Sequence, residues 1–141
     1  LDVLRGLADW AIEHARFSSQ AARFLAALGP AADGAEDVQR LVQLAGKSKG
    51  KAYHALAVGL ANNGARQHVG LLVGGYRRTA GRRHAADHAR TIRKALQTLT
   101  GLELPDPGAG RHDEPDPAKV EEGARMVAQW IAKTERAQPG Q

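Results

Sequence analysis

The spacing of the apolar residues restricts this chain to helical folds. From Val3 to Leu28 they stand alternately four and three residues apart, which would make one side of a single long α-helix apolar. The same spacing recurs around Leu72 and Ile92. Most apolar residues are Ala, Leu and Val, with only two Trp, two Tyr and two Phe, whereas a β-sandwich favours β-branched and aromatic residues. We therefore expect an all-α fold.

Helix-breaking residues divide the chain into about six helices. Gly29-Pro30 is expected to end the first helix, because proline cannot continue the hydrogen-bond ladder. Residues 101–118 hold four prolines, three glycines and five acidic residues, which indicates a flexible or disordered acidic loop before the last helix. The length fits one compact helical domain over residues 1–141. The expected helices cover residues 1–28, 33–46, 51–62, 65–76, 79–100 and about 117 to the end.

Three local features carry more specific expectations. The apolar side of the first helix is expected to be buried, with His14 as a hydrogen-bonded core residue. Asp33 and Glu36 have the spacing of a capping box, in which two side chains satisfy backbone N–H groups at a helix start. The glycines within residues 70–75 each lower helix stability, so they indicate close packing of the backbone at that helix.

The charges divide the chain into three parts. Residues 47–94 carry eleven basic residues and one acidic residue, for a net charge of +10, whereas residues 1–46 carry −2 and residues 95–141 carry −3. A solubilising surface normally mixes both signs, so this central segment favours binding to a polyanion. No pattern for reading bases stands out, which favours contacts with the phosphate backbone. The candidate nucleic-acid-binding residues are Lys47, Lys49, Lys51, Arg66, Arg77, Arg78, Arg82, Arg83, Arg90, Arg93 and Lys94.

Several classes of protein are disfavoured by composition. The chain has no cysteine, which excludes disulfides, thiolate metal sites and cysteine nucleophiles. No segment approaches the ~20 consecutive apolar residues that span a bilayer, and the first residues lack the layout of a secretory signal. We expect a cytoplasmic protein that binds no membrane, holds no metal or cofactor and has no catalytic residues.

One pair of residues supports an enzymatic alternative. Arg83 and His88 resemble the Arg-x4-6-His signature of HEPN-type ribonucleases, which are small helical proteins that cut RNA without a metal. That resemblance implies that Arg83 would stabilise charge on the phosphate and His88 would transfer protons, usually across a dimer. A metal-independent ribonuclease therefore remains an alternative to binding alone. A third possibility is a helical protein that binds only other proteins.

Two segments resemble a known family. The run Leu60–Leu72 contains Asn63-Gly64, then Gln67, and continues into an apolar stretch. The segment 130–133, with the sequence Trp-Ile-Ala-Lys, follows near the C-terminus. Both segments resemble the small helical subunit of CRISPR effector ribonucleoproteins, in its type III (Cmr-like) or type IV form.

This resemblance implies an all-helical, non-catalytic subunit of an antiviral ribonucleoprotein complex. Copies of such subunits stack head to tail, contact the backbone subunits and hold the guide RNA or the guide–target duplex by its phosphates, while base pairing supplies the specificity. In this chain the basic centre would face nucleic acid, and the acidic flanks would meet neighbouring proteins.

Overall fold

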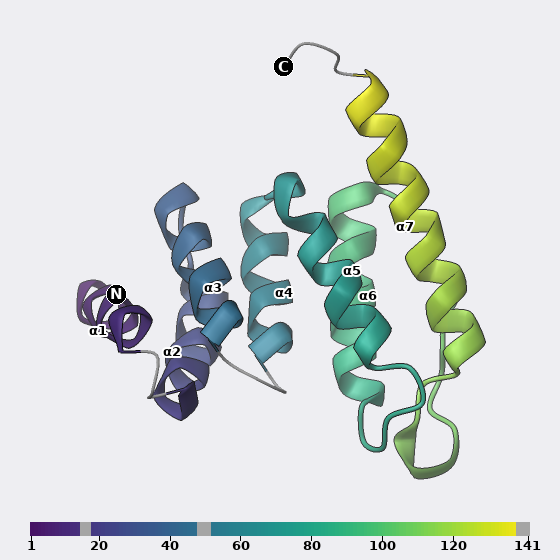
Figure 1. The fold of residues 1–141 in the computed structure, drawn as a ribbon, viewed down its shortest axis with the longest axis horizontal. Helices are drawn as coiled ribbons and strands as arrows, with labels where there is room; N and C mark the ends of the chain where they lie inside the picture. Colours follow the sequence, from purple (N-terminus) through teal and green to yellow (C-terminus); the bar gives the residue numbers. More distant parts are fainter. Residues whose placement is uncertain (15–17, 48–51, 138–141) are drawn as a thin grey trace. The chain divides into compact units, whose positions relative to one another are not determined.

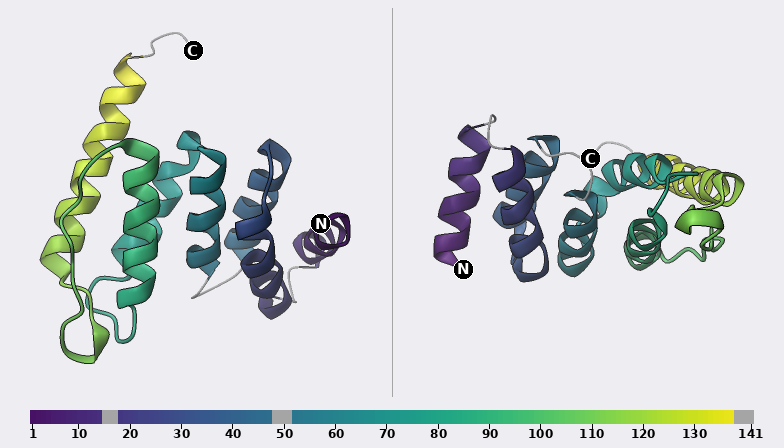
Figure 2. Two further views of the ribbon diagram at one scale, coloured as in Figure 1. Left: turned by 180° about the vertical axis from the view of Figure 1, so that it is seen from behind. Right: turned by 90° about the horizontal axis from the view of Figure 1, so that it is seen from below.

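The computed structural model describes residues 1–14, 18–47 and 52–137, and this part of the chain is helical without a β-strand (Figures 1 and 2). The predicted all-α class is therefore confirmed. The elements are α1 (Asp2–Glu13), α2 (Ser18–Ala31), α3 (Ala35–Lys47), α4 (Ala52–Asn63), η1 (Arg66–His68), α5 (Val69–Arg78), α6 (Ala86–Thr100), η2 (Arg111–Asp113) and α7 (Pro117–Ala137).

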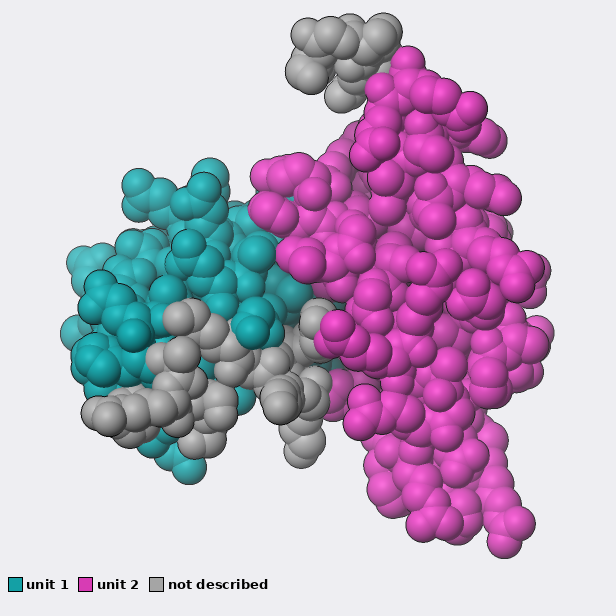
Figure 3. Space-filling view, in the orientation of Figure 1, with its two compact units in different colours: residues 1–65 teal, residues 66–141 magenta. Residues whose placement is uncertain are grey.

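The chain forms two compact units, which Figure 3 colours separately. The N-terminal unit comprises residues 1–65 and the C-terminal unit residues 66–141. A single domain over the whole chain stays a prediction, and we describe each unit by itself.

The N-terminal segment contains two helices where the sequence predicted one. The backbone leaves the helical region at His14, with φ −110° and ψ 69°, and α1 ends at Glu13. At the other end, α2 continues to Ala31, one residue beyond Pro30. The single helix over residues 1–28 was therefore wrong, because α1 turns away from the line of α2.

The core of the N-terminal unit lies where α2 packs against α1, α3 and α4. Leu25 and Leu28 on α2 are fully buried, as are the leucines at 41 and 44 on α3 and at 56 and 60 on α4. Each such leucine contributes about 1.5–3 kcal/mol to stability relative to an exposed one. Leucines at helical spacing therefore explain why these three helices assemble.

Two glycines allow α2 and α4 to approach closely. A Cβ added at Gly29 would overlap the backbone carbonyl of Ala55, and one added at Gly59 would overlap the Leu41 side chain and approach the carbonyl oxygen of Gly29. By contrast, a Cβ at Gly70 or at Gly74 would meet nothing within 4 Å. The predicted close packing was therefore wrong at Gly70 and Gly74, since the tight crossing lies at α2 and α4, whereas Gly75 is buried.

The end of α4 holds the connection between α2 and α3. Gly64 has φ +61°, a left-handed conformation that glycine adopts without strain, and the next residue donates a hydrogen bond back to Leu60 O at 3.2 Å. The side chain of Asn63 accepts from Gly34 N at 2.7 Å and donates to Ala32 O at 3.4 Å. The Asn63-Gly64 pair therefore ends one helix and fixes a loop 29 residues away in sequence.

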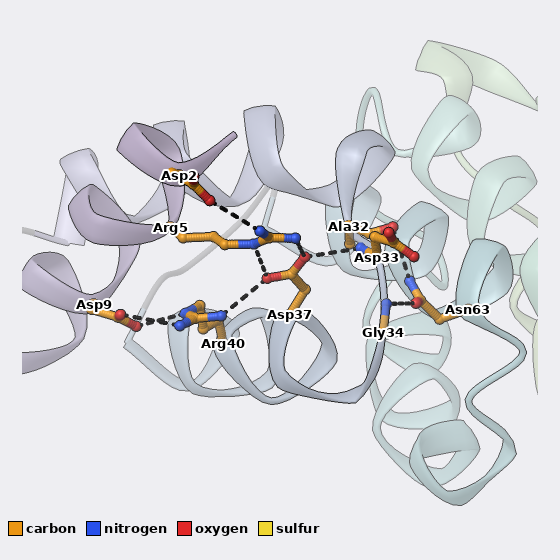
Figure 4. A network of polar contacts seen from close by, with 9 residues as sticks. All are labelled: Asp2, Arg5, Asp9, Ala32, Asp33, Gly34, Asp37, Arg40 and Asn63. Carbon is orange, nitrogen blue, oxygen red and sulfur yellow. Dashed lines mark hydrogen bonds and ion pairs between the residues drawn. The ribbon is translucent and has the colours of Figure 1, made fainter.

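A buried carboxylate joins α1 to α3 (Figure 4). Asp37 is 1% exposed and accepts two hydrogen bonds from Arg5, both at 2.9 Å, and one from Arg40 at 3.1 Å. Arg40 also binds Asp9 at 2.7 and 3.3 Å. The hydrogen bonds from Arg5 hold the pKa of Asp37 below its usual range, against the opposing effect of burial.

The Asp37 carboxylate also takes part in the start of α3, where the sequence predicted a capping box. Helix α3 begins at Ala35, one residue later than a cap at Asp33 requires. Asp37 Oδ2 accepts a hydrogen bond from the backbone N–H of Asp33 at 2.9 Å, so it fills the role predicted for Glu36. The prediction placed a carboxylate at the helix start, but in the wrong register.

In the C-terminal unit, α5 packs against α6 and α7 around Tyr76. This side chain is fully buried, and its hydroxyl has no hydrogen-bond partner among the described residues. Burial raises the pKa of Tyr76 to about 12. The tyrosine therefore acts as a core residue that stays neutral at physiological pH.

We predict opposite effects for alanine at two kinds of glycine. Gly29→Ala should lower the free energy of unfolding by about 1–3 kcal/mol, because the new methyl group would overlap the backbone carbonyl of Ala55 where α2 crosses α4. Gly74→Ala should raise it by up to about 1 kcal/mol, because alanine favours a helix and the space is open. Urea unfolding followed by circular dichroism measures both. Equal effects would contradict the close approach at Gly29.

We also predict that Asp37→Asn lowers the free energy of unfolding at pH 7 by about 2–3 kcal/mol, because two arginines lose a charged partner. A carboxyl with a lowered pKa stabilises the fold above its unfolded pKa of about 3.9, and the contribution disappears as pH falls through the folded pKa. The difference from the wild type should therefore shrink below pH 4. Asp2→Asn is the control, since it touches the same Arg5 from an exposed position and should cost less than about 0.5 kcal/mol.

Candidate nucleic-acid interface

Seven of the eleven predicted cations lie on the C-terminal unit between the end of α5 and the middle of α6. Lys49 and Lys51 lie outside the described residues, and only the backbone of Lys47 is described. Arg66 is exposed in η1. The seven are Arg77 and Arg78 in the last turn of α5, Arg82 and Arg83 in the turn before α6, and Arg90, Arg93 and Lys94 on α6.

Two of these arginines are held by contacts within the protein. Arg93 is half-buried and donates from Nε and Nη2 to the carbonyl oxygen of Leu104, at 3.1 and 2.7 Å. Arg77 forms a two-point ion pair with Glu121 on α7 at 3.2 and 3.3 Å, and this hydrogen bonding lowers the pKa of Glu121. Their primary contacts are therefore structural.

Arg93 also explains part of the conformation of the acidic loop. The backbone N–H of Leu104 donates to Gln97 Oε1 at 2.9 Å, so both polar groups of this residue bind to α6. The Leu104 side chain is buried. These contacts anchor the beginning of the loop, while its flexibility stays a prediction.

The exposed side of α6 carries the cations that are best placed for a ligand. Arg90 and Lys94 are exposed and lie one turn apart, about 6 Å along the helix axis. Arg90 pairs with Asp87 at 2.8 Å, but both side chains are largely exposed, and such pairs contribute little to stability. Ile92 and Leu96 fill the opposite, buried side of the helix. The packing of α6 therefore directs a short row of positive charge toward solvent.

The turn before α6 carries two further exposed arginines. Arg82 and Arg83 are exposed, and the turn is held by hydrogen bonds from Gly81 N to Pro115 O at 3.0 Å and from His84 N to His112 O at 2.9 Å. The predicted helix over residues 79–100 was wrong in its first seven positions, since α6 begins at residue 86. We call Arg82, Arg83, Arg90 and Lys94 the basic face.

The acidic loop adds one cation that the sequence analysis missed. Arg111 is exposed and immediately precedes His112, so the backbone contact to the turn brings it near Arg82 and Arg83. Asp113 lies there too, with a carboxylate oxygen 3.8 Å from His84 Nδ1. The loop is acidic overall, which concealed this arginine in the sequence. Its carboxylates also limit how far the positive potential extends at this end.

The residues of the ribonuclease alternative lie on different elements. Arg83 is exposed in the turn, whereas His88 is half-buried in the first turn of α6. His84, the other histidine of this stretch, has φ +58° and lies outside the helix. These positions do not test whether the protein is a ribonuclease.

Comparison of the chain with protein-family models, with curated proteins and with solved structures gives no match. Within residues 1–14, 18–47 and 52–137, no helix is both long and apolar enough to cross a membrane. In the same part of the chain, no three His, Cys, Asp or Glu side chains are grouped so that they could hold a metal ion. A proposal for the function therefore rests on the positions of the cations.

We predict that the cations of α6 differ in how much they contribute to the stability of the protein. Arg93→Gln should lower the free energy of unfolding by about 1.5–3 kcal/mol, because a charged donor to a buried segment is lost. Arg90→Gln should change it by less than about 0.5 kcal/mol, since that side chain is exposed. Urea unfolding of the two variants tests this, and an equal loss would show that Arg93 does not anchor the loop.

Proposed function

We propose that this chain is a non-catalytic protein that binds the phosphate backbone of nucleic acid through its basic face. The observation that carries the proposal is the exposure of Arg82 and Arg83 in the turn before α6 and of Arg90 and Lys94 on α6. These side chains are directed to solvent, whereas Arg77 and Arg93 bind within the protein.

The chemistry of the basic face favours phosphates over bases. Arginine presents a planar fork of N–H donors that matches two phosphate oxygens, and lysine adds a mobile positive charge. Each phosphate that is neutralised releases counterions, so binding should weaken steeply as salt rises. The face carries no aromatic side chain on which a base could stack and no Asn or Gln to read one. Sequence-independent binding follows.

The resemblance to CRISPR small subunits supports a more specific version of the proposal. In that version the nucleic acid is the guide RNA or its duplex with the target strand, and base pairing supplies the specificity. Backbone subunits of the complex and further copies of this chain would be its protein partners.

We predict that charge reversal on α6 weakens RNA binding. Arg90→Glu combined with Lys94→Glu should lower the affinity for duplex RNA at least about tenfold and reduce the salt dependence by about two phosphate contacts. Lys119→Glu combined with Lys133→Glu is the matched control, because it changes the net charge equally at exposed positions of α7. A gel mobility shift over a salt series measures both.

Three outcomes would overturn the proposal. Equal weakening by both double variants would mean that only net charge matters, and no binding at low salt would leave a protein that binds other proteins. The same RNA is also run on a denaturing gel. Cleavage that is lost in His88→Ala would replace the non-catalytic role with the ribonuclease.

A further inference from the structure

A cleft lies in the C-terminal unit where the turn before α6 meets the loop that leads into α7. The turn and the loop lie side by side in Figure 1. The volume of the cleft is about 410 Å³, which is within the range of pockets that hold small ligands. Prolines form much of its wall, and Arg111, Glu114 and Asp116 are its charged residues. The cleft therefore combines apolar surface with charges of both signs.

Backbone hydrogen bonds fix the walls of this cleft. Gly81 N donates to Pro115 O at 3.0 Å, which joins the turn to the loop, and Asp116 N donates to Pro107 O at 3.0 Å, which closes the loop on itself. All four residues line the cleft, and the two prolines are buried. The cleft is therefore formed by the fold itself, so a ligand has little backbone to order when it binds.

Two of the three charged side chains in the cleft are not used by the fold. Asp116 is engaged, because its Oδ1 accepts a hydrogen bond from Ala118 N at 3.0 Å at the start of α7. Glu114 is half-buried and Arg111 is exposed, and neither side chain forms a hydrogen bond or an ion pair with another described residue. The cleft therefore offers a ligand one carboxylate acceptor and one guanidinium donor.

These two groups match the two ends of a guanine nucleotide. The Watson–Crick edge of guanine carries two neighbouring N–H donor groups, which the two oxygens of a carboxylate can accept together. Adenine, cytosine and uracil each present a single donor group on that edge. Arginine binds a phosphate through two N–H groups, and apolar side chains such as proline provide surface against which a base can pack. Guanine is therefore the base that uses the carboxylate most fully.

The charges around the cleft determine which end of the nucleotide enters. The carboxylates of Glu114 and Asp116 repel a phosphate, whereas a base is neutral. Gly81 lines the cleft and is followed directly by Arg82 and Arg83 of the basic face. The base should therefore enter the cleft, while the phosphate stays with the arginines at its edge.

We propose that the cleft binds a guanine nucleotide, with its base held by Glu114 and its phosphate by Arg111. The nucleotide is either an unpaired guanine in a strand bound by the basic face or a free guanine nucleotide. The first source rests on the proposed function, and it adds one base-specific contact to sequence-independent binding of the backbone. The second source does not depend on that function. The same chemistry serves both, and the experiments distinguish them.

The first experiment titrates guanosine monophosphate (GMP) into the whole chain, labelled for heteronuclear NMR. The amide signals of Gly81 and Gly110, which line the cleft, should shift as GMP binds. The affinity for GMP should be at least about tenfold higher than for adenosine monophosphate (AMP), because guanine donates to both carboxylate oxygens. Guanosine without its phosphate should bind more weakly than GMP, since Arg111 then has no partner.

Two variants assign the contacts to their side chains. Glu114→Gln keeps the size of the side chain but removes the charged acceptor, so it should abolish the preference for GMP over AMP. Arg111→Gln should weaken the binding of GMP and leave that of guanosine unchanged. Glu103→Gln is the matched control, because it removes an exposed carboxylate of the same loop that does not line the cleft. Circular dichroism checks that each variant keeps its helical content.

The second experiment uses single-stranded RNA to distinguish the two sources. A short uridine strand with one central guanine should bind more tightly than the same strand with adenine at that position, and Glu114→Gln should remove this difference. Arg90→Glu combined with Lys94→Glu should weaken both strands equally, because those cations contact only the backbone. A preference for GMP without a preference for the guanine strand would assign the cleft to a free nucleotide.

Two results would overturn the inference. One is the absence of any preference for guanine over adenine, both in the free nucleotides and in the strands. The other is an equal loss of the preference in Glu103→Gln and Glu114→Gln, which would place the contact elsewhere. The proposed function fails separately, since a chain that prefers GMP but binds no RNA keeps the cleft and loses the nucleic-acid interface. RNA binding without any preference for guanine gives the reverse result.

Discussion

The buried carboxylate of Asp37 determines how the N-terminal unit is built. A carboxylate that is removed from water must be paired, and Arg5 and Arg40 supply that pairing from α1 and α3. The same oxygen atoms bind the backbone of the loop that precedes α3. One charged group therefore fixes the start of α3, the position of α1 and the side of α1 that faces inward. The exposure of Val3, Leu7 and Trp10 on the other side of α1, which the sequence predicted to be buried, is a consequence of this arrangement.

The two units use their arginines in different ways. In the N-terminal unit, Arg5 and Arg40 are bound to carboxylates between helices. In the C-terminal unit, Arg93 and Arg77 fasten the acidic loop and α7, while the cations next to them on α6 face solvent. A high count of basic residues therefore overstates the area available to a ligand. The contact each side chain makes decides whether it can bind phosphate.

The sequence predicted the helices well, but it did not predict which side of each helix is buried. Spacing of three and four identifies a helix because it depends only on local geometry. Each α-helix of the described residues corresponds to a predicted segment, although α1 and α2 were predicted as one. The side of α1 that is buried depends on Asp37, 32 residues from Arg5, which no local pattern reveals. Gly59 looked unremarkable for the same reason, since its role requires α2 beside it.

The candidate interface shows the same division between local and distant effects. The excess of basic residues in residues 47–94 was visible in the sequence, and it correctly located exposed cations on α6. The structural roles of Arg93 and Arg77 were not visible, because their partners lie 11 and 44 residues away. Arg111 was missed because the segment that contains it, residues 101–118, is acidic overall. The charge counted along the sequence predicts the sign of a surface, whereas the fold determines which residues lie on it.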